Sequence, residues 1–146
     1  MPRFGSVVTA MVTPFTDEGK VDHRVAADLA RHLVANGSDG LVVAGSTGEG
    51  SVLGDEERVE LFRTVIGAVD VPVVAATGTN DTAHSIMLTE EAAACGADGV
   101  LVVTPYYNRP SKAGIAAHFR AVAASTELPV VLYDIPIRSG RRIGMS

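Results

Sequence analysis

Three tyrosines, all that the chain of 146 residues contains, stand at the ends of two short apolar segments. Tyr106 and Tyr107 belong to Thr-Pro-Tyr-Tyr-Asn-Arg-Pro at 104–110, and Tyr133 belongs to Leu-Tyr-Asp-Ile-Pro at 132–136. A phenol hydroxyl can donate and accept a proton, so a tyrosine can act as an acid–base relay. The alternative is amphipathic packing, with the ring buried and the hydroxyl in water. The residues alone leave both interpretations open.

The segment Gly-Ser-Thr-Gly-Glu-Gly at 45–50 sets two adjacent hydroxyls, Ser46 and Thr47, among glycines. Backbone N–H groups and side-chain donors in such a loop can converge on a small anion. The spacing is not that of a dinucleotide-binding loop, and the lysine of a phosphate-binding P-loop is absent. A tight turn between a strand and a helix explains the same residues, so both interpretations stay open.

A third candidate is Arg138, which follows Tyr133 closely and could bind a carboxylate through two parallel hydrogen bonds. The alternative is a solvated loop charge. Asp134 and Glu49 lie near these segments without an evident partner carboxylate. A hydrolase with paired acids therefore lacks support.

The other ionisable side chains predict no further chemistry. The histidines lack metal-ligand spacing and fall in helical segments, so we expect surface or helix-end positions and no metal; they are His23, His32, His84 and His118. Several charged residues share one helical segment, and we interpret them as a solvated face: Glu56, Glu57, Arg58 and Glu60.

Five short segments rich in Val and Leu must position these candidates. They are apolar on both faces, as strands covered on two sides should be, and span residues 6–12, 40–44, 71–76, 99–103 and 128–133. Longer segments with helical spacing separate them. The predicted N-caps of these helices are Asp22, Asp55, Asp81 and Ser111.

Four strand–helix units followed by a fifth strand allow two α/β architectures. A five-stranded doubly wound sheet fits the length, and periodicity alone favours it. A (β/α)8 barrel takes roughly 250 residues, so this chain would form its first five strands only. Both architectures place ligands at the carboxyl ends of the strands. The loops at those ends are 13–15, 45–50, 77–81, 104–110 and 134–140.

Composition excludes several classes of protein. A formal charge of −5 without a Lys/Arg run argues against nucleic-acid and membrane-surface partners. With 47% hydrophobic and 20% charged residues, intrinsic disorder is excluded. One cysteine cannot form an internal disulfide. No apolar stretch approaches the roughly 20 residues of a membrane span, and the N-terminus is a poor secretory signal. We expect a cytoplasmic protein with a single domain over 1–146.

Four motifs, in this order, carry a resemblance to a known family: Thr-Pro-Phe at 13–15, Gly-Ser-Thr-Gly-Glu at 45–49, Val-Thr-Pro-Tyr-Tyr-Asn-Arg-Pro at 103–110 and Tyr-Asp-Ile-Pro-x-Arg-Ser-Gly at 133–140. The chain resembles dihydrodipicolinate synthases (4-hydroxy-tetrahydrodipicolinate synthases), within the N-acetylneuraminate lyase group of Schiff-base aldolases. Segment 103–110 looks more like the synthase. Gly-Ser-Thr-Gly-Glu leans toward the lyase, because the synthase usually reads Gly-Thr-Thr-Gly-Glu-Ser.

The resemblance implies a TIM barrel, of which this chain would form about five strands and four helices, and this overrides the preference for a doubly wound sheet. It implies condensation of pyruvate with aspartate semialdehyde in lysine and diaminopimelate biosynthesis, without cofactor or metal, by a homotetramer. By similarity, Ser46 and Thr47 would hold the pyruvate carboxylate, and Arg138 would bind the incoming carboxylate. Tyr133 would move protons at the imine. Ser46 would link it to Tyr107, which would reach in from a neighbouring subunit.

The family's imine-forming lysine lies on the sixth strand. The two lysines of this chain, Lys20 and Lys112, fall in a turn and at a helix start. We therefore expect an N-terminal portion of the barrel that is inactive alone, and marginally stable or self-associating because its edge strands are open. Two alternatives stay open: a non-catalytic half-barrel, and a fragment of an N-acetylneuraminate lyase or keto-deoxy-sugar aldolase relative.

Overall fold

The computed structural model describes residues 3–144, which form one five-stranded parallel sheet with helices between the strands. The strands are β1 (Val8–Ala10), β2 (Gly40–Val43), β3 (Val73–Ala76), β4 (Gly99–Val103) and β5 (Val130–Tyr133). The helices are α1 (His23–Ala35), the short 3-10 helix η1 (Gly50–Val52), α2 (Asp55–Ile66), α3 (Thr82–Ala94), α4 (Lys112–Ala123) and α5 (Pro136–Ser139). All five predicted strands are confirmed, some with shorter bounds. Among these residues, no helix has the length and apolar character needed to cross a bilayer.

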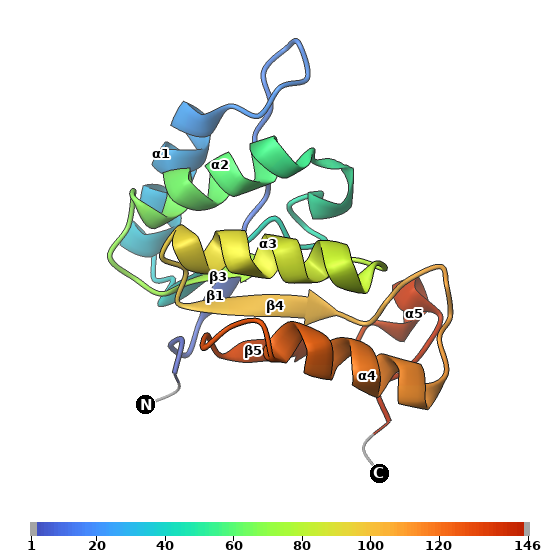
Figure 1. Cartoon of the computed structure of the whole chain (residues 1–146). Coiled ribbons are helices and arrows are strands. Elements are labelled where there is room, and N and C mark those ends of the chain that lie inside the picture. Colours follow the sequence, from blue (N-terminus) through green and yellow to red (C-terminus); the bar gives the residue numbers. More distant parts are fainter. Residues whose placement is uncertain (1–2, 145–146) are drawn as a thin grey trace.

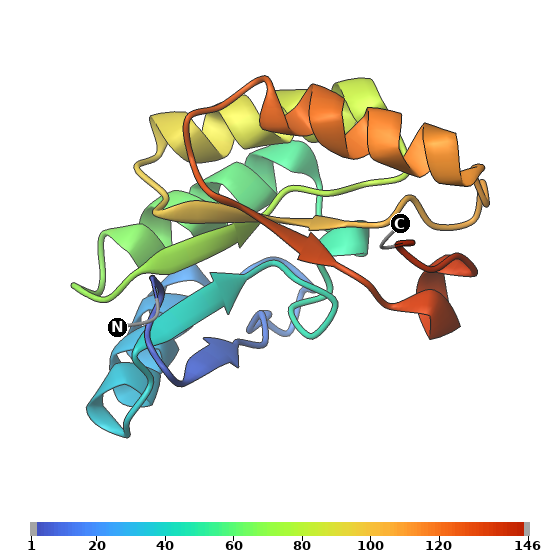
Figure 2. The ribbon, with the colours of Figure 1, turned by 90° about the horizontal axis from the view of Figure 1, so that it is seen from below.

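The strands pair in sequence order, β1-β2-β3-β4-β5, and every pair is parallel. Crossovers between parallel strands are almost always right-handed. Because each strand is added on the same side of the strand before it, all the connecting helices lie on the same face of the sheet. Figures 1 and 2 show α2, α3 and α4 side by side on one face of the curved sheet. A doubly wound sheet would reverse its strand order and carry helices on both faces. The fold is therefore the half-barrel that the resemblance implies.

Local capping explains where the helices begin. Three predicted N-caps are confirmed, because their side chains accept a hydrogen bond from a backbone N–H in the first turn: Asp22, Asp81 and Ser111. The prediction for Asp55 is wrong, since it is the first residue of α2 and Gly54 is the N-cap. The Glu57 carboxylate accepts a hydrogen bond from the Gly54 N–H at 3.1 Å, which satisfies that donor without a capping side chain at Gly54.

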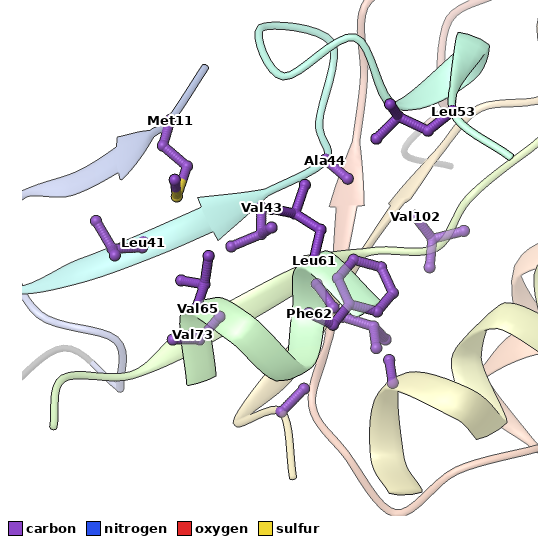
Figure 3. Packing of buried hydrophobic residues seen from close by; sticks show 14 of the residues in the cluster. Met11, Leu41, Val43, Ala44, Leu53, Leu61, Phe62, Val65, Val73 and Val102 are labelled. Atoms are coloured by element: carbon purple, nitrogen blue, oxygen red, sulfur yellow. The ribbon is translucent and has the colours of Figure 1, made fainter. Parts of the chain in front are cut away.

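The core lies between the sheet and α2. Leu61, Phe62 and Val65 of α2 belong to one buried cluster with Leu41 and Val43 of β2, and Figure 3 shows the Phe62 ring on the side of Val102. All six side chains are at most 1% exposed. Burial of one such side chain is worth about 1.5–3 kcal/mol, so this layer contributes most to holding α2 on the sheet.

The expectation that every histidine lies at the surface or a helix end is wrong for His118. It is only 4% exposed, because it shares the inner face of α4 with Ile115 and Val122. Its Nδ1 lies 2.9 Å from the Thr82 hydroxyl oxygen on α3, and its Nε2 is buried without a partner among residues 3–144. Burial lowers the pKa of His118, while the charge of Asp81 opposes that shift.

This burial predicts a loss of stability in mild acid. The unfolded chain takes up a proton at the ordinary histidine pKa of about 6.5, whereas the folded chain does so only at lower pH. The contribution of His118 to stability is therefore complete above that pH and falls as pH drops below it. In urea unfolding at about pH 7.5 and about pH 5, we expect His118→Gln to lose less stability than the parent chain. His32→Gln, at an exposed position, should behave like the parent. An equal acid loss in His118→Gln and the parent would contradict the assignment.

Candidate active site

A cavity of about 380 Å³ opens at the carboxyl ends of the strands, within the range typical of small-molecule sites. Helix α5 lies beyond the ends of β4 and β5 and lines one side of it (Figures 1 and 2). Four side chains predicted from the sequence line this one cavity: Ser46, Tyr107, Tyr133 and Arg138. The fifth, Thr47, is exposed in the loop beside Ser46 and is not among the lining residues.

The loop after β2, which carries Ser46, is held by close backbone contacts. The buried Thr13 hydroxyl donates a hydrogen bond to the Gly48 carbonyl at 2.6 Å. A Cβ at position 50 would overlap the Ala44 carbonyl oxygen, so Gly50 is required for the chain to turn back this closely. The loop therefore presents the Ser46 side chain from a fixed backbone.

The loop after β4 places two tyrosines at the cavity through an uncommon backbone conformation. Tyr107 and Arg109 have positive φ angles of 68° and 50°, which non-glycine residues seldom adopt. The Asn108 side-chain amide donates to the Asn80 carbonyl at 2.8 Å, and its backbone N–H donates to the Tyr106 carbonyl at 2.8 Å. The first bond ties the loop to the one after β3, and the second closes a turn within the loop itself. Tyr107 lines the cavity yet remains 88% exposed.

The end of β5 and α5 supply the opposite side of the site. The Tyr133 carbonyl accepts a hydrogen bond from the Thr104 N–H at 3.2 Å, which fixes the backbone where the phenol leaves the strand. Ser139 is 1% exposed and donates to the Arg141 carbonyl at 2.7 Å, so it anchors the short helix that carries Arg138. The Tyr133 phenol and the Arg138 guanidinium thus come from β5 and α5, two consecutive elements that hydrogen bonds hold in place.

Arg58 is a lining residue that sequence reasoning missed, and its interpretation as part of a solvated face is wrong. It is 4% exposed, and its Nη2 donates to the Gly50 carbonyl. Burial lowers the pKa of Arg58, while Tyr106 and Asp55 oppose the shift. Its spacing offered a signal, because residues three and four positions later on the helix, Leu61 and Phe62, are core residues.

The two lysines lie outside this cavity. Lys20 precedes α1 in a loop, and Lys112 is the first residue of α4. Neither is among the residues that line the site. Across residues 3–144, no group of three or more His, Cys, Asp or Glu side chains is arranged to hold a metal ion.

Comparisons with known proteins agree on one family. A model of the dihydrodipicolinate synthetase family matches residues 3–146. The 4-hydroxy-tetrahydrodipicolinate synthase of Symbiobacterium thermophilum is 54% identical over 141 residues, which cover 95% of this chain and 48% of that protein. The chain thus spans about half the length of the curated relatives it matches.

Solved structures show the same relationship. A dihydrodipicolinate synthase from Bacillus anthracis superposes with a TM-score of 0.94 at 48% identity, over 96% of this chain and 49% of the other. The dihydrodipicolinate synthase of Acinetobacter baumannii, in complex with pyruvate, superposes with a TM-score of 0.93 at 37% identity, over 96% of this chain and 49% of the other.

Proposed function

The chain belongs to the dihydrodipicolinate synthetase family, and we propose that it supplies the N-terminal part of an active site that condenses pyruvate with aspartate semialdehyde. This reaction would serve lysine and diaminopimelate biosynthesis in the cytoplasm. The observation that carries the proposal is the meeting of Ser46, Tyr133 and Arg138 in one cavity, although they come from a loop, a strand and a helix. Hydroxyl, phenol and guanidinium groups together suit a small keto acid.

Two carboxylates need recognition in this reaction. Ser46 and Thr47 would bind the pyruvate carboxylate, with the Ser46 hydroxyl at the cavity wall and Thr47 supporting it from the same loop. Arg138 would bind the carboxylate of aspartate semialdehyde, since a guanidinium can donate two parallel hydrogen bonds to it. The complex of the Acinetobacter relative with pyruvate supports pyruvate as the ligand.

Proton transfer would fall to the tyrosines. When an amine attacks the keto carbon of pyruvate, the carbonyl oxygen must leave as water, and Tyr133 would deliver the required proton. Ser46 would connect Tyr133 to Tyr107. The 88% exposure of Tyr107 supports a position between subunits, so we propose a homo-oligomer, with a tetramer suggested by the family.

The amine itself would come from the part of the barrel that these 146 residues do not include. Lys20 and Lys112 lie away from the cavity, and neither has the apolar surroundings that favour a neutral, nucleophilic amine. We therefore propose that catalysis requires this chain together with the remaining strands of the barrel.

Borohydride trapping tests the proposal. A chimera would join this chain to the remaining half of the Symbiobacterium thermophilum synthase, which is 54% identical over the shared region. With pyruvate and borohydride, we expect intact-mass analysis to show a stable adduct on a lysine of the added half. The 146-residue chain alone should show no adduct.

Lys112→Arg in the chimera is the matched control and should leave the adduct unchanged. An adduct on Lys20 or Lys112, or none in the folded chimera, would contradict the proposal. Consumption of aspartate semialdehyde, measured against N-acetylmannosamine, separates the synthase from a neuraminate lyase.

A further inference from the structure

The charges of this chain are divided unevenly along the sequence. Residues 104–146 contain six Lys and Arg against two Asp and Glu, which gives a formal charge of +4. Residues 1–103 contain six Lys and Arg against fifteen Asp and Glu, which gives −9 and accounts for the −5 of the whole chain. The C-terminal part of the sequence is therefore cationic within an acidic protein.

Five of the six cations lie in one region of the structure, which we call the cationic rim: Arg109, Lys112, Arg138, Arg141 and Arg142. Figures 1 and 2 show why, since α5 lies beside the loop between β4 and α4. The Nε of Arg141 donates to the Arg109 carbonyl at 3.3 Å, and a Cβ on Gly140 would lie 3.4 Å from Nε of Arg109. A Cβ on Gly144 would lie 3.5 Å from Nζ of Lys112. Segments on both sides of β5 thus bring their charges together.

The cationic rim borders the cavity at the carboxyl ends of β4 and β5. Arg138 lines that cavity, and so does Tyr107, which stands two residues before Arg109. All five cations of the rim are exposed, so their charges act on the solvent in front of the cavity.

The rim has no neutralising partner in the described part of the chain. The ion pairs among residues 3–144 lie on α1, α2 and α3, and none includes a cation of the rim. Asp134, which precedes α5, accepts a hydrogen bond from the Ile143 N–H at 3.1 Å. Even with Asp134 counted, four net positive charges remain at this end of the sheet.

Charges that border a cavity affect its potential more than distant charges do. At physiological ionic strength the Debye length is about 8 Å, so exposed carboxylates farther away are largely screened. A positive potential can therefore persist at the cavity although the whole chain carries −5.

We propose that the cationic rim attracts small anions to the cavity and raises their rate of entry. Electrostatic steering of this kind can raise association rates by about 10-fold to 1,000-fold. A small anion suits a cavity of about 380 Å³, whereas a long polyanion would also meet the −9 of the remaining sequence. The identity of the anion rests on the proposed function, under which it would be pyruvate.

Collisional quenching of tyrosine fluorescence measures the local potential. The chain contains no tryptophan, and all three of its tyrosines line the cavity. Quenching of the 146-residue chain by iodide, caesium ion and neutral acrylamide would be compared at a total salt concentration of about 50 mM, where screening is weak. Relative to acrylamide, a positive potential strengthens quenching by iodide and weakens quenching by caesium.

The test variant carries Arg141→Gln together with Arg142→Gln. We expect its iodide quenching constant, relative to that of acrylamide, to fall by about twofold or more, and its caesium constant to rise. At about 0.5 M salt, where the Debye length is about 4 Å, the difference from the parent should largely disappear.

Two further double variants are matched controls. Arg141→Lys with Arg142→Lys keeps both charges but removes the Nε that donates to the Arg109 carbonyl, and should match the parent. Arg24→Gln with Arg31→Gln removes two exposed charges from α1 and should also match it. The proposal is overturned if the Gln pair on the rim matches the parent at low salt, or if either control falls as far as that pair.

Kinetics of the chimera test whether pyruvate is the steered anion. With Arg141→Gln and Arg142→Gln, kcat/KM for pyruvate should fall by about twofold to fivefold at low salt, while kcat stays unchanged. An unchanged kcat/KM in an active chimera would overturn the steering role. An inactive chimera would contradict the proposed reaction instead, because quenching is measured on the 146-residue chain without catalysis.

Discussion

Replacing Tyr133 with phenylalanine is expected to lower kcat of the chimeric barrel by about 100-fold to 10,000-fold, the usual contribution of a positioned acid–base group. The substitution removes only the hydroxyl. The backbone of residue 133 keeps its place, because its carbonyl accepts a hydrogen bond from the Thr104 N–H. We therefore expect kcat to fall because proton transfer is impaired, while the shape of the site stays the same.

Steady-state kinetics of the chimera with pyruvate and aspartate semialdehyde would check this result. KM for pyruvate should change much less than kcat, since Ser46 and Thr47 would still bind the carboxylate. Tyr107→Phe offers a comparison on the same cavity, with a smaller expected loss because Tyr107 would act through Ser46. A Tyr133→Phe chimera within threefold of the parent kcat would contradict the proton-transfer role.

Phe62→Ala is expected to destabilise the chain by about 3–5 kcal/mol, the range measured for truncating buried aromatic residues. Phe62 of α2 is fully buried, in one hydrophobic cluster with Leu61 and Val102 (Figure 3). Removing its ring leaves a cavity that the packed neighbours cannot fill. Since small domains are stable by only about 5–15 kcal/mol, much of the folded population is at risk.

Urea unfolding followed by circular dichroism measures this loss. Val52→Ala is the control, because Val52 is 73% exposed on η1 and its truncation should change stability by no more than about 0.5 kcal/mol. A Phe62→Ala loss below about 1 kcal/mol would mean that α2 does not pack on the sheet as described.

The elements of this fold were predictable because each depends on local sequence. The apolar segments at 71–76 and 99–103 contain strands β3 and β4, as their composition predicts, and Asp22 and Ser111 cap the helices as their residue types suggest. The architecture was not predictable in this way. Strand order depends on contacts between distant segments, and the same local signals fit a doubly wound sheet and a barrel.

Parallel strands place ligands at their carboxyl ends, and this rule correctly predicts that four residues line one cavity: Ser46, Tyr107, Tyr133 and Arg138. It does not say which of two neighbouring loop residues lines the cavity: Ser46 and Thr47 are both exposed, and Ser46 is the one among the lining residues. Arg58 was missed because residue type was given more weight than helical position. Arg58 lies four residues before the core residue Phe62 and therefore on the buried face of α2. Its charged side chain suggests exposure, but the structure shows that it is buried.

Strand pairing strictly between sequence neighbours has a consequence for how the protein forms during synthesis. Each new strand–helix unit can dock on the unit made just before it, without waiting for a distant segment. This half of the barrel can therefore fold one strand–helix unit at a time while the chain emerges from the ribosome. The residues that line the cavity would then come together late, because Arg138 follows the last of the five strands.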